Sequence, residues 1–139
     1  MNARTVRSSL PLAVLAALAA TGCSSLPFGQ PEEPALVVQS QPKGNGTSVT
    51  IASFTLPEDG YVVVHADANG RPGPVIGQTE LIEAGTYTNV PVRIDASRAG
   101  ERVHPMLHID DGDGVYEFPG ADGPATFGGS PLVAPVDWL

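Results

Sequence analysis

The sequence contains one cysteine and few basic residues, and each shortage removes a class of protein. A single cysteine, Cys23, cannot form an internal disulfide, so the fold must rest on an apolar core or on bound ions. Seven Lys and Arg stand against fifteen Asp and Glu, for a formal net charge of −8. Nucleic-acid binding depends on clustered basic residues. We therefore expect a soluble acidic exterior and no nucleic-acid partner.

Helical patterns and the common catalytic motifs are also missing. No segment after residue 47 carries a long helical apolar stripe, and no strand–helix–strand pattern supports a Rossmann cofactor site. The chain has no Gly-x-Ser-x-Gly elbow, no phosphate-binding glycine–lysine loop and no His-Glu-x-x-His pair. We therefore expect a protein that is not an enzyme.

What is present begins with an N-terminal segment that ends at Cys23. Arg4 and Arg7 precede an uncharged apolar run at residues 10–20, and small residues continue up to the cysteine. The run is about half of the ~20 residues that a membrane-spanning helix needs, but it fits the apolar region of a signal peptide. An ordinary secretory signal would leave Cys23 as an odd thiol in an oxidising compartment.

This segment resembles a prokaryotic lipoprotein signal peptide. In that family the cysteine thiol takes a diacylglycerol, the preceding chain is removed, and the new N-terminus lies at a membrane. The resemblance implies loss of residues 1–22 and a membrane contact through lipidated Cys23, in the cell envelope outside the cytoplasm. In a diderm bacterium, Ser24 matches the sorting pattern for the outer membrane. Cleavage leaves five basic and fifteen acidic residues, a mature net charge of −10.

The mature chain divides into a tether and one domain. Residues 23–47 are rich in Pro, Gly, Ser and Gln, a composition that cannot bury enough apolar surface to fold, so it predicts a flexible tether. Inside it, residues 36–38 also fit a short edge strand, and that alternative stays open. Residues 48–139 have the length of a single domain.

Strand patterns recur through residues 48–139. The clearest alternation runs from Val90 to Ile94, where every second residue is aliphatic, and a period of two places those residues on one face. In the first run the same period groups Val49 and Ile51 with Ser53. About seven short strands separated by Gly, Pro and Asp turns predict an all-β fold, an antiparallel two-sheet (immunoglobulin-like) sandwich.

The densest polar cluster is the acidic loop, residues 110–124. Asp110, Asp111, Asp113 and Asp122 offer carboxylates, and the glycines between them let the chain curl around a hard cation such as Ca²⁺. The loop is not an EF-hand, because the third acid and the turn glycine of that motif are missing. The alternative is a turn system in which Asp–Gly pairs reverse the chain without an ion.

A second candidate site is formed by His104, Met106 and His108. Alternate positions on a strand share one face, and imidazole with thioether suits copper, especially Cu(I). The alternative is a sheet face on which half-exposed histidines hydrogen-bond to nearby carbonyl groups.

Three segments, residues 49–65, 85–87 and 108–124, carry a family resemblance. They resemble a domain of unknown function that recurs in haloarchaeal and some bacterial cell-surface proteins. The resemblance implies an extracytoplasmic β-sandwich and brings no activity or ligand with it. With the lipoprotein segment, it predicts a membrane-anchored, non-catalytic binding or structural module whose partner is a cell-envelope protein or polymer. The alternative is an extracytoplasmic metal-handling protein that uses Ca²⁺ at the acidic loop or copper at the histidine face.

Overall fold

The structure is a computed structural model that describes residues 32–139. Cys23 and the signal-peptide segment lie outside the described residues, so cleavage and lipidation stay predictions. Within the described part, no helix has the length and apolar character that a membrane crossing requires.

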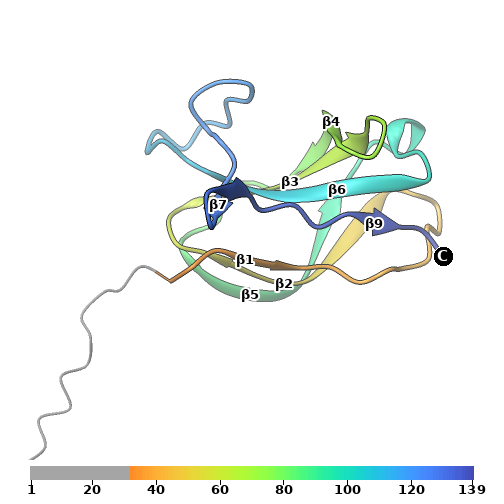
Figure 1. The fold of residues 1–139 in the computed structure, drawn as a ribbon, viewed down its shortest axis with the longest axis horizontal. Coiled ribbons are helices and arrows are strands. Elements are labelled where there is room, and N and C mark those ends of the chain that lie inside the picture. Colours follow the sequence, from red (N-terminus) through yellow and green to blue (C-terminus); the bar gives the residue numbers. More distant parts are fainter. Residues whose placement is uncertain (1–31) are drawn as a thin grey trace, which may run out of the picture.

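Nine strands and one 3₁₀ turn make up the regular structure of residues 32–139 (Figure 1). In chain order they are β1 (Ala35–Val37), β2 (Ser48–Leu56), β3 (Gly60–Asp67), β4 (Pro72–Gln78), β5 (Gly85–Arg93), the 3₁₀ turn η1 (Ala96–Arg98), β6 (Arg102–Ile109), β7 (Thr126–Phe127), β8 (Ser130–Pro131) and β9 (Val136–Asp137). The strands form three antiparallel sheets with the orders β1-β2-β5, β4-β3-β6-β9 and β7-β8.

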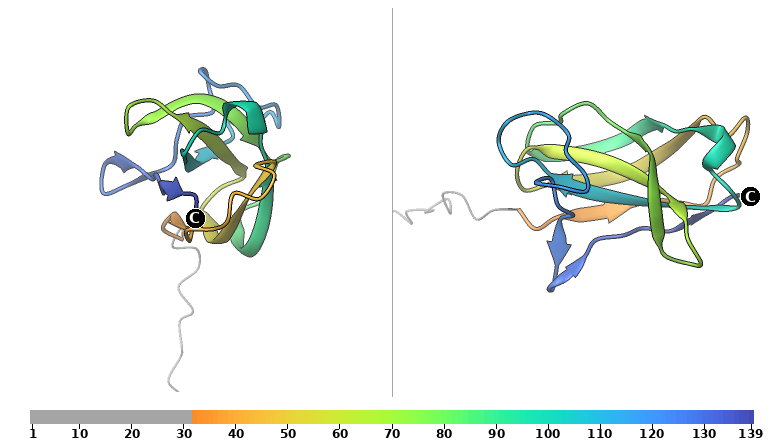
Figure 2. Two further views of the ribbon diagram at one scale, coloured as in Figure 1. Left: turned by 90° about the vertical axis from the view of Figure 1, so that its right-hand side faces the viewer. Right: turned by 90° about the horizontal axis from the view of Figure 1, so that it is seen from above.

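The two larger sheets pack face to face, as Figures 1 and 2 show from three directions. This confirms the predicted all-β antiparallel sandwich. The strand number exceeds the expected seven because β7 and β8 have only two residues each, too few for a sequence pattern. Their hairpin is the third sheet.

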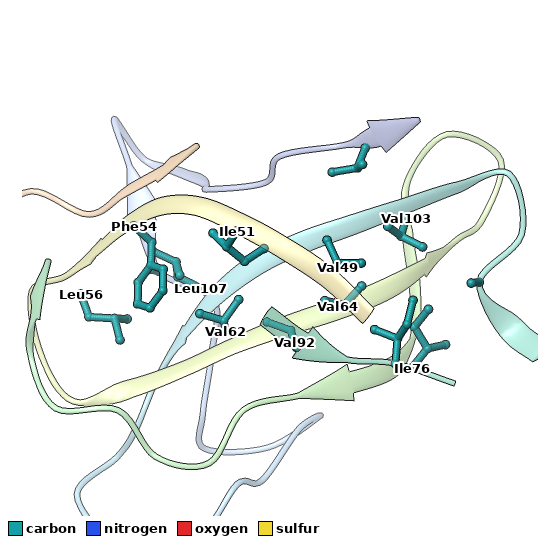
Figure 3. Close-up of a cluster of buried hydrophobic side chains, with 14 residues drawn as sticks. Val49, Ile51, Phe54, Leu56, Val62, Val64, Ile76, Val92, Val103 and Leu107 are labelled. Atoms are coloured by element: carbon teal, nitrogen blue, oxygen red, sulfur yellow. The ribbon is translucent and has the colours of Figure 1, made fainter. Parts of the chain in front are cut away.

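The core fills the space between the two sheets (Figure 3). Each sheet contributes every second residue, because side chains alternate across a strand. Val92 is 1% exposed whereas its neighbour Arg93 is exposed, which confirms the facing predicted for this strand. The labelled core residues are Val49, Ile51, Phe54, Leu56, Val62, Val64, Ile76, Val92, Val103 and Leu107.

The facing predicted for the end of β2 is wrong. Phe54 is 1% exposed, whereas Ser53 is only partly buried. The alternation changes between the paired residues 51↔90 and 53↔88, where Ala52 and Asn89 are the intervening residues. Asn89 has a left-handed φ of 53°, which interrupts the regular extended backbone at this point.

The folded domain also begins earlier than Ser48. β1 lies inside the predicted tether and pairs with β2, with Leu36 opposite Phe54. Gln41 then brackets Thr50: its side chain accepts from the Thr50 N–H at 2.9 Å and donates to the Thr50 carbonyl at 3.1 Å. The Pro and Gly content of the segment masked an alternation in which Leu36 and Val38 pack against the core.

Candidate functional site

The outer face of β3 and β6 is the face turned away from the core. The strands pair in register, so that Tyr61 lies opposite His108, Val63 opposite Met106 and His65 opposite His104. All six side chains are buried, and the exposed fraction of each imidazole is 2% or less. The structure therefore brings His104, Met106 and His108 to one face, as predicted, but corrects the expectation that the histidines are half-exposed.

The acidic loop covers this outer face. It leaves the end of β6 and returns to β7 at the same end of the sandwich (Figure 1). Phe118 packs edge-on to His108, with ring centres 4.6 Å apart, and to His65 at 5.6 Å. Tyr116 packs against Tyr61 at 5.1 Å. The aromatic residues of the loop thus form a second small core outside the sandwich.

Each histidine of the outer face uses one ring nitrogen in a hydrogen bond to oxygen. His65 Nδ1 lies 2.7 Å from the Gly73 carbonyl oxygen, and His108 Nδ1 lies 2.9 Å from that of Asp122. His104 Nε2 lies 2.7 Å from a carboxylate oxygen of Asp67. The other ring nitrogen of each histidine is buried without a hydrogen-bond partner among the residues that the structure describes.

Sequence analysis missed His65. It lies on a different strand, 39 positions before His104, and only the register of β3 with β6 brings the two together. Its sole signal was its place at the end of an apolar strand.

Burial keeps the imidazoles of His65 and His108 neutral at neutral pH. Desolvation lowers the pKa of His108 to about 4, and it lowers the pKa of His65 below its ordinary value. The hydrogen bond from His104 lowers the pKa of its partner, the Asp67 carboxyl. A neutral imidazole is the form that binds metals.

The acidic loop brings together three of its four predicted carboxylates. Asp110, Asp111 and Asp113 each place one oxygen within 4.8 Å of the others. The same carboxylates already accept hydrogen bonds from backbone N–H groups of the loop. Gly112 and Gly114 adopt positive φ angles of 108° and 74°, which glycine accepts readily. The loop can therefore satisfy its backbone as a turn system without an ion.

Asp122 does not join that group, which corrects the predicted set of four ligands. Its side chain is fully buried, where it accepts from the N–H of Asp111 at 3.0 Å and from the N–H of Glu117 at 2.6 Å. Asp122 thereby ties the two halves of the loop together. The loop is also tied to β3, because the Tyr61 hydroxyl donates to Asp110 at 3.1 Å. The pKa of Tyr61 is raised to about 12, mainly by burial and secondly by this hydrogen bond.

A third region is the polar face, the outer side of β2 and β5 with the 39–47 segment beside it. It contains two hollows of about 620 and 510 Å³ that share Ser48. Their lining consists mainly of hydroxyl, amide, proline and basic residues, without a carboxylate or an imidazole. These residues are Gln39, Ser40, Gln41, Pro42, Lys43, Gly44, Asn45, Thr47, Ser48, Thr50, Ala52, Asn89, Pro91, Arg93 and Ile94.

Comparisons with known proteins identify a family and two relatives for this chain. Residues 34–137 match the family model described as a domain of unknown function, DUF7282. Two relatives from Haloarcula hispanica are similar: Cell surface glycoprotein 2, 36% identical over 99 residues, and Cell surface glycoprotein 1, 33% identical over 98 residues. Each match covers 69% of this chain and 10% of the relative, so the chain spans about a tenth of the length of the curated relatives it matches. No solved structure matches the chain.

These relatives point to the cell envelope or cell surface as the place where such a domain works. The matched range begins at Pro34, just before β1, and ends in β9, so it coincides with the sandwich described above. The chain therefore belongs to the family of the domain of unknown function DUF7282, a β-sandwich domain of cell-surface proteins.

Proposed function

We propose that this chain is a lipid-anchored, extracytoplasmic surface module that binds a cell-envelope polymer and performs no catalysis. The observation that carries the proposal is the family membership, because the same domain occurs in two relatives named as cell surface glycoproteins. A lipoprotein with this domain needs only an anchor and a binding face to serve at such a surface.

The proposed anchor is lipidated Cys23, and the start of the first strand sets the length of the tether behind it. Since β1 begins at Ala35, only residues 24–34 separate the cysteine from the first strand. A fully extended chain of that length reaches roughly 40 Å at most. Such a short tether keeps the sandwich close to the membrane.

The polar face has the chemistry of a polymer-binding surface. Hydroxyl and amide groups both donate and accept hydrogen bonds, which is what the hydroxyl groups of a glycan require. Arg93 adds a positive charge to an otherwise acidic molecule. The described chain enters at one end of the sandwich, whereas β2 begins and β5 ends at the other end (Figure 2). The hollow at Thr47 and Arg93 therefore lies at the end away from the tether.

Anchoring is tested by Cys23→Ser in the host, with Ser25→Ala as the matched control. The wild-type protein and Ser25→Ala should partition into the detergent phase of Triton X-114, because a diacylated cysteine supplies the two chains that stable anchoring needs. Cys23→Ser should stay unprocessed or partition into the aqueous phase. Mature wild-type protein found wholly in the aqueous phase would contradict the anchor.

Polymer binding is tested by sedimentation of the purified protein with cell-envelope material stripped of protein and lipid. Arg93→Ser should reduce the bound fraction several-fold, because it removes the positive charge from the hollow. Arg71→Ser changes the net charge equally but lies in the exposed turn between β3 and β4, so it should bind as wild type does. Equal binding by both variants, or no sedimentation of the wild type, would refute this part of the proposal.

Metal handling is a second candidate function, and the buried histidines favour it. At the acidic loop, the carboxylates are engaged with the loop's own N–H groups. At the outer face of β3 and β6, three ring nitrogens have no hydrogen-bond partner among the described residues. The candidate therefore rests on the histidines rather than on the acidic loop.

A further inference from the structure

His65 and His108 repeat the same local arrangement. In each ring Nδ1 faces a backbone carbonyl oxygen, at 2.7 Å in His65 and 2.9 Å in His108. A carbonyl oxygen only accepts, so Nδ1 carries the hydrogen in both neutral rings and Nε2 carries the lone pair. Both Nε2 atoms are buried without a partner in the described part of the chain. Two lone pairs cannot hydrogen-bond to each other. The two Nε2 atoms therefore lack a donor hydrogen or a cation that could accept their electron pairs.

The two rings lean toward each other across the strand pair. His65 lies opposite His104, four residues along β6 from His108, which is roughly 13 Å at the rise of a strand. The ring centres are nevertheless only 5.6 Å apart, with a tilt of 30° between the planes. With a metal–nitrogen bond of about 2 Å, two imidazoles that share one ion have centres roughly 5–6 Å apart.

Met106 lies on the same outer face, in the strand row between those of His65 and His108. It occupies the β6 position halfway between His104 and His108, opposite Val63, and its exposed fraction is 6%. Phe118 packs edge-on to both imidazoles, and both imidazoles are shielded from water, with exposed fractions of 2% and 0%. A thioether is a soft ligand that selects Cu(I), and neutral imidazole also suits copper.

The ligand count decides which cation fits. Among the described residues, the only three His, Cys, Asp or Glu side chains whose ligand atoms lie together are the aspartates of the acidic loop. His104 therefore does not supply a third nitrogen beside His65 and His108. Zn²⁺ prefers four nitrogen, sulfur or oxygen ligands, whereas thioether ligands select Cu(I). The arrangement of a carbonyl oxygen behind each imidazole is also typical of metal-binding histidines.

We propose that His65 Nε2, His108 Nε2 and the sulfur of Met106 bind one Cu⁺ ion beneath the acidic loop. The site is independent of the anchor and of the polar face, so its failure would leave the proposed surface role untouched. This set of ligands differs from the His104, Met106 and His108 set predicted from the sequence, because His65 takes the place of His104.

The test is an anaerobic Cu⁺ titration of the untagged full-length chain against a chromogenic Cu⁺ chelator. Cys23→Ser serves as the background, because a free thiol would bind copper itself. The parent should bind one equivalent of Cu⁺, and Zn²⁺ should not compete. His65→Gln and His108→Gln should each weaken binding by more than about 100-fold, beyond the loss typical for a group that only supports a ligand.

Two variants keep the result independent of folding. Met106→Leu conserves volume, so it should leave the melting temperature of the metal-free protein nearly unchanged while weakening Cu⁺ binding about 10-fold or more. His104→Gln makes the same chemical change on the same face and should bind Cu⁺ within about 3-fold of the parent, since it supplies no ligand in the proposed site.

Four results of the titrations would overturn the site. They are the absence of stoichiometric Cu⁺ binding, a loss of affinity in His104→Gln equal to that in His65→Gln, tighter binding of Zn²⁺ than of Cu⁺, and Met106→Leu binding as the parent does. X-ray absorption of the loaded parent should show two nitrogens and one sulfur, and a spectrum without sulfur would equally contradict the proposal.

Discussion

Gly77 and Gly123 differ in the space that an added methyl group would find. At Gly77, in β4, a Cβ atom would run into the backbone carbonyl oxygen of Arg93 and lie 2.9 Å from the Ile94 Cα. This is where β4 meets the end of β5, and the Asp95 N–H donates to the Ile76 carbonyl beside it at 2.8 Å. At Gly123 a Cβ atom would meet nothing within 4 Å.

Gly77→Ala should therefore destabilise the domain and Gly123→Ala should not. Overpacking against backbone costs about 1–3 kcal/mol of the free energy of unfolding. The change at Gly123 should stay within ~0.5 kcal/mol. Urea unfolding of the two variants beside the wild type measures this difference. Equal midpoints for both variants would show that β4 does not approach β5 as closely as described.

The buried histidines predict how the stability of the metal-free protein depends on pH. The pKa of His108 is about 4 in the folded state, below the 6.5 of a free imidazole. The unfolded chain therefore binds the proton first as pH falls, and the stabilisation present above about pH 6.5 is lost as pH falls toward 4. His65 contributes in the same direction.

Urea unfolding with a chelator at pH 7.5, 6 and 5 should show this loss, amounting to at most about 3 kcal/mol for His108. His108→Gln should flatten the profile, because its side chain does not titrate. A profile that is as steep in His108→Gln as in the wild type would contradict burial of a neutral His108.

At the scale of elements, the acidic loop is the part whose interpretation depends most on the structure. Its carboxylates accept hydrogen bonds from N–H groups two to four residues on, and Asp122 joins its halves. An asparagine oxygen can accept the same bonds. We therefore expect the loop to keep its shape when its charge is reduced.

The variant that carries both Asp111→Asn and Asp113→Asn tests this expectation. Neither it nor the wild type should show a rise in melting temperature with Ca²⁺ beyond that seen at equal ionic strength with Na⁺. Gly112→Val should be the damaging change, because a β-branched residue avoids the φ of 108° found there. A rise at micromolar Ca²⁺ that disappears in the double variant would show a calcium site instead.

Elements with their own period could be predicted, and elements that depend on distant partners could not. Residues 90–94 alternate clearly, and their facing is confirmed. β1 was obscured by prolines around it, and the change of facing near Asn89 has no local signal. At the outer face of β3 and β6, the shared side of His104 and His108 followed from spacing. His65 and the covering Phe118 did not, because one depends on strand register and the other lies in an irregular loop.

At the scale of the whole molecule, the sandwich has two different ends. The described chain enters at the end that carries the acidic loop and the β7-β8 hairpin, and it finishes at the opposite end with Leu139 (Figures 1 and 2). In the proposed lipid-anchored form, residues 24–34 would connect the first of these ends to the membrane, and the hollow at the start of β2 lies at the opposite end. This form depends on one chemical event, the lipidation of Cys23.

The most direct measurement of the central claim is the mass of the mature N-terminal peptide from protein isolated from the membranes of its native host. The account predicts that Cys23 is the first residue and that its sulfur carries a diacylglyceryl group. A mature chain that begins elsewhere, or that keeps Cys23 as a free thiol, would contradict it.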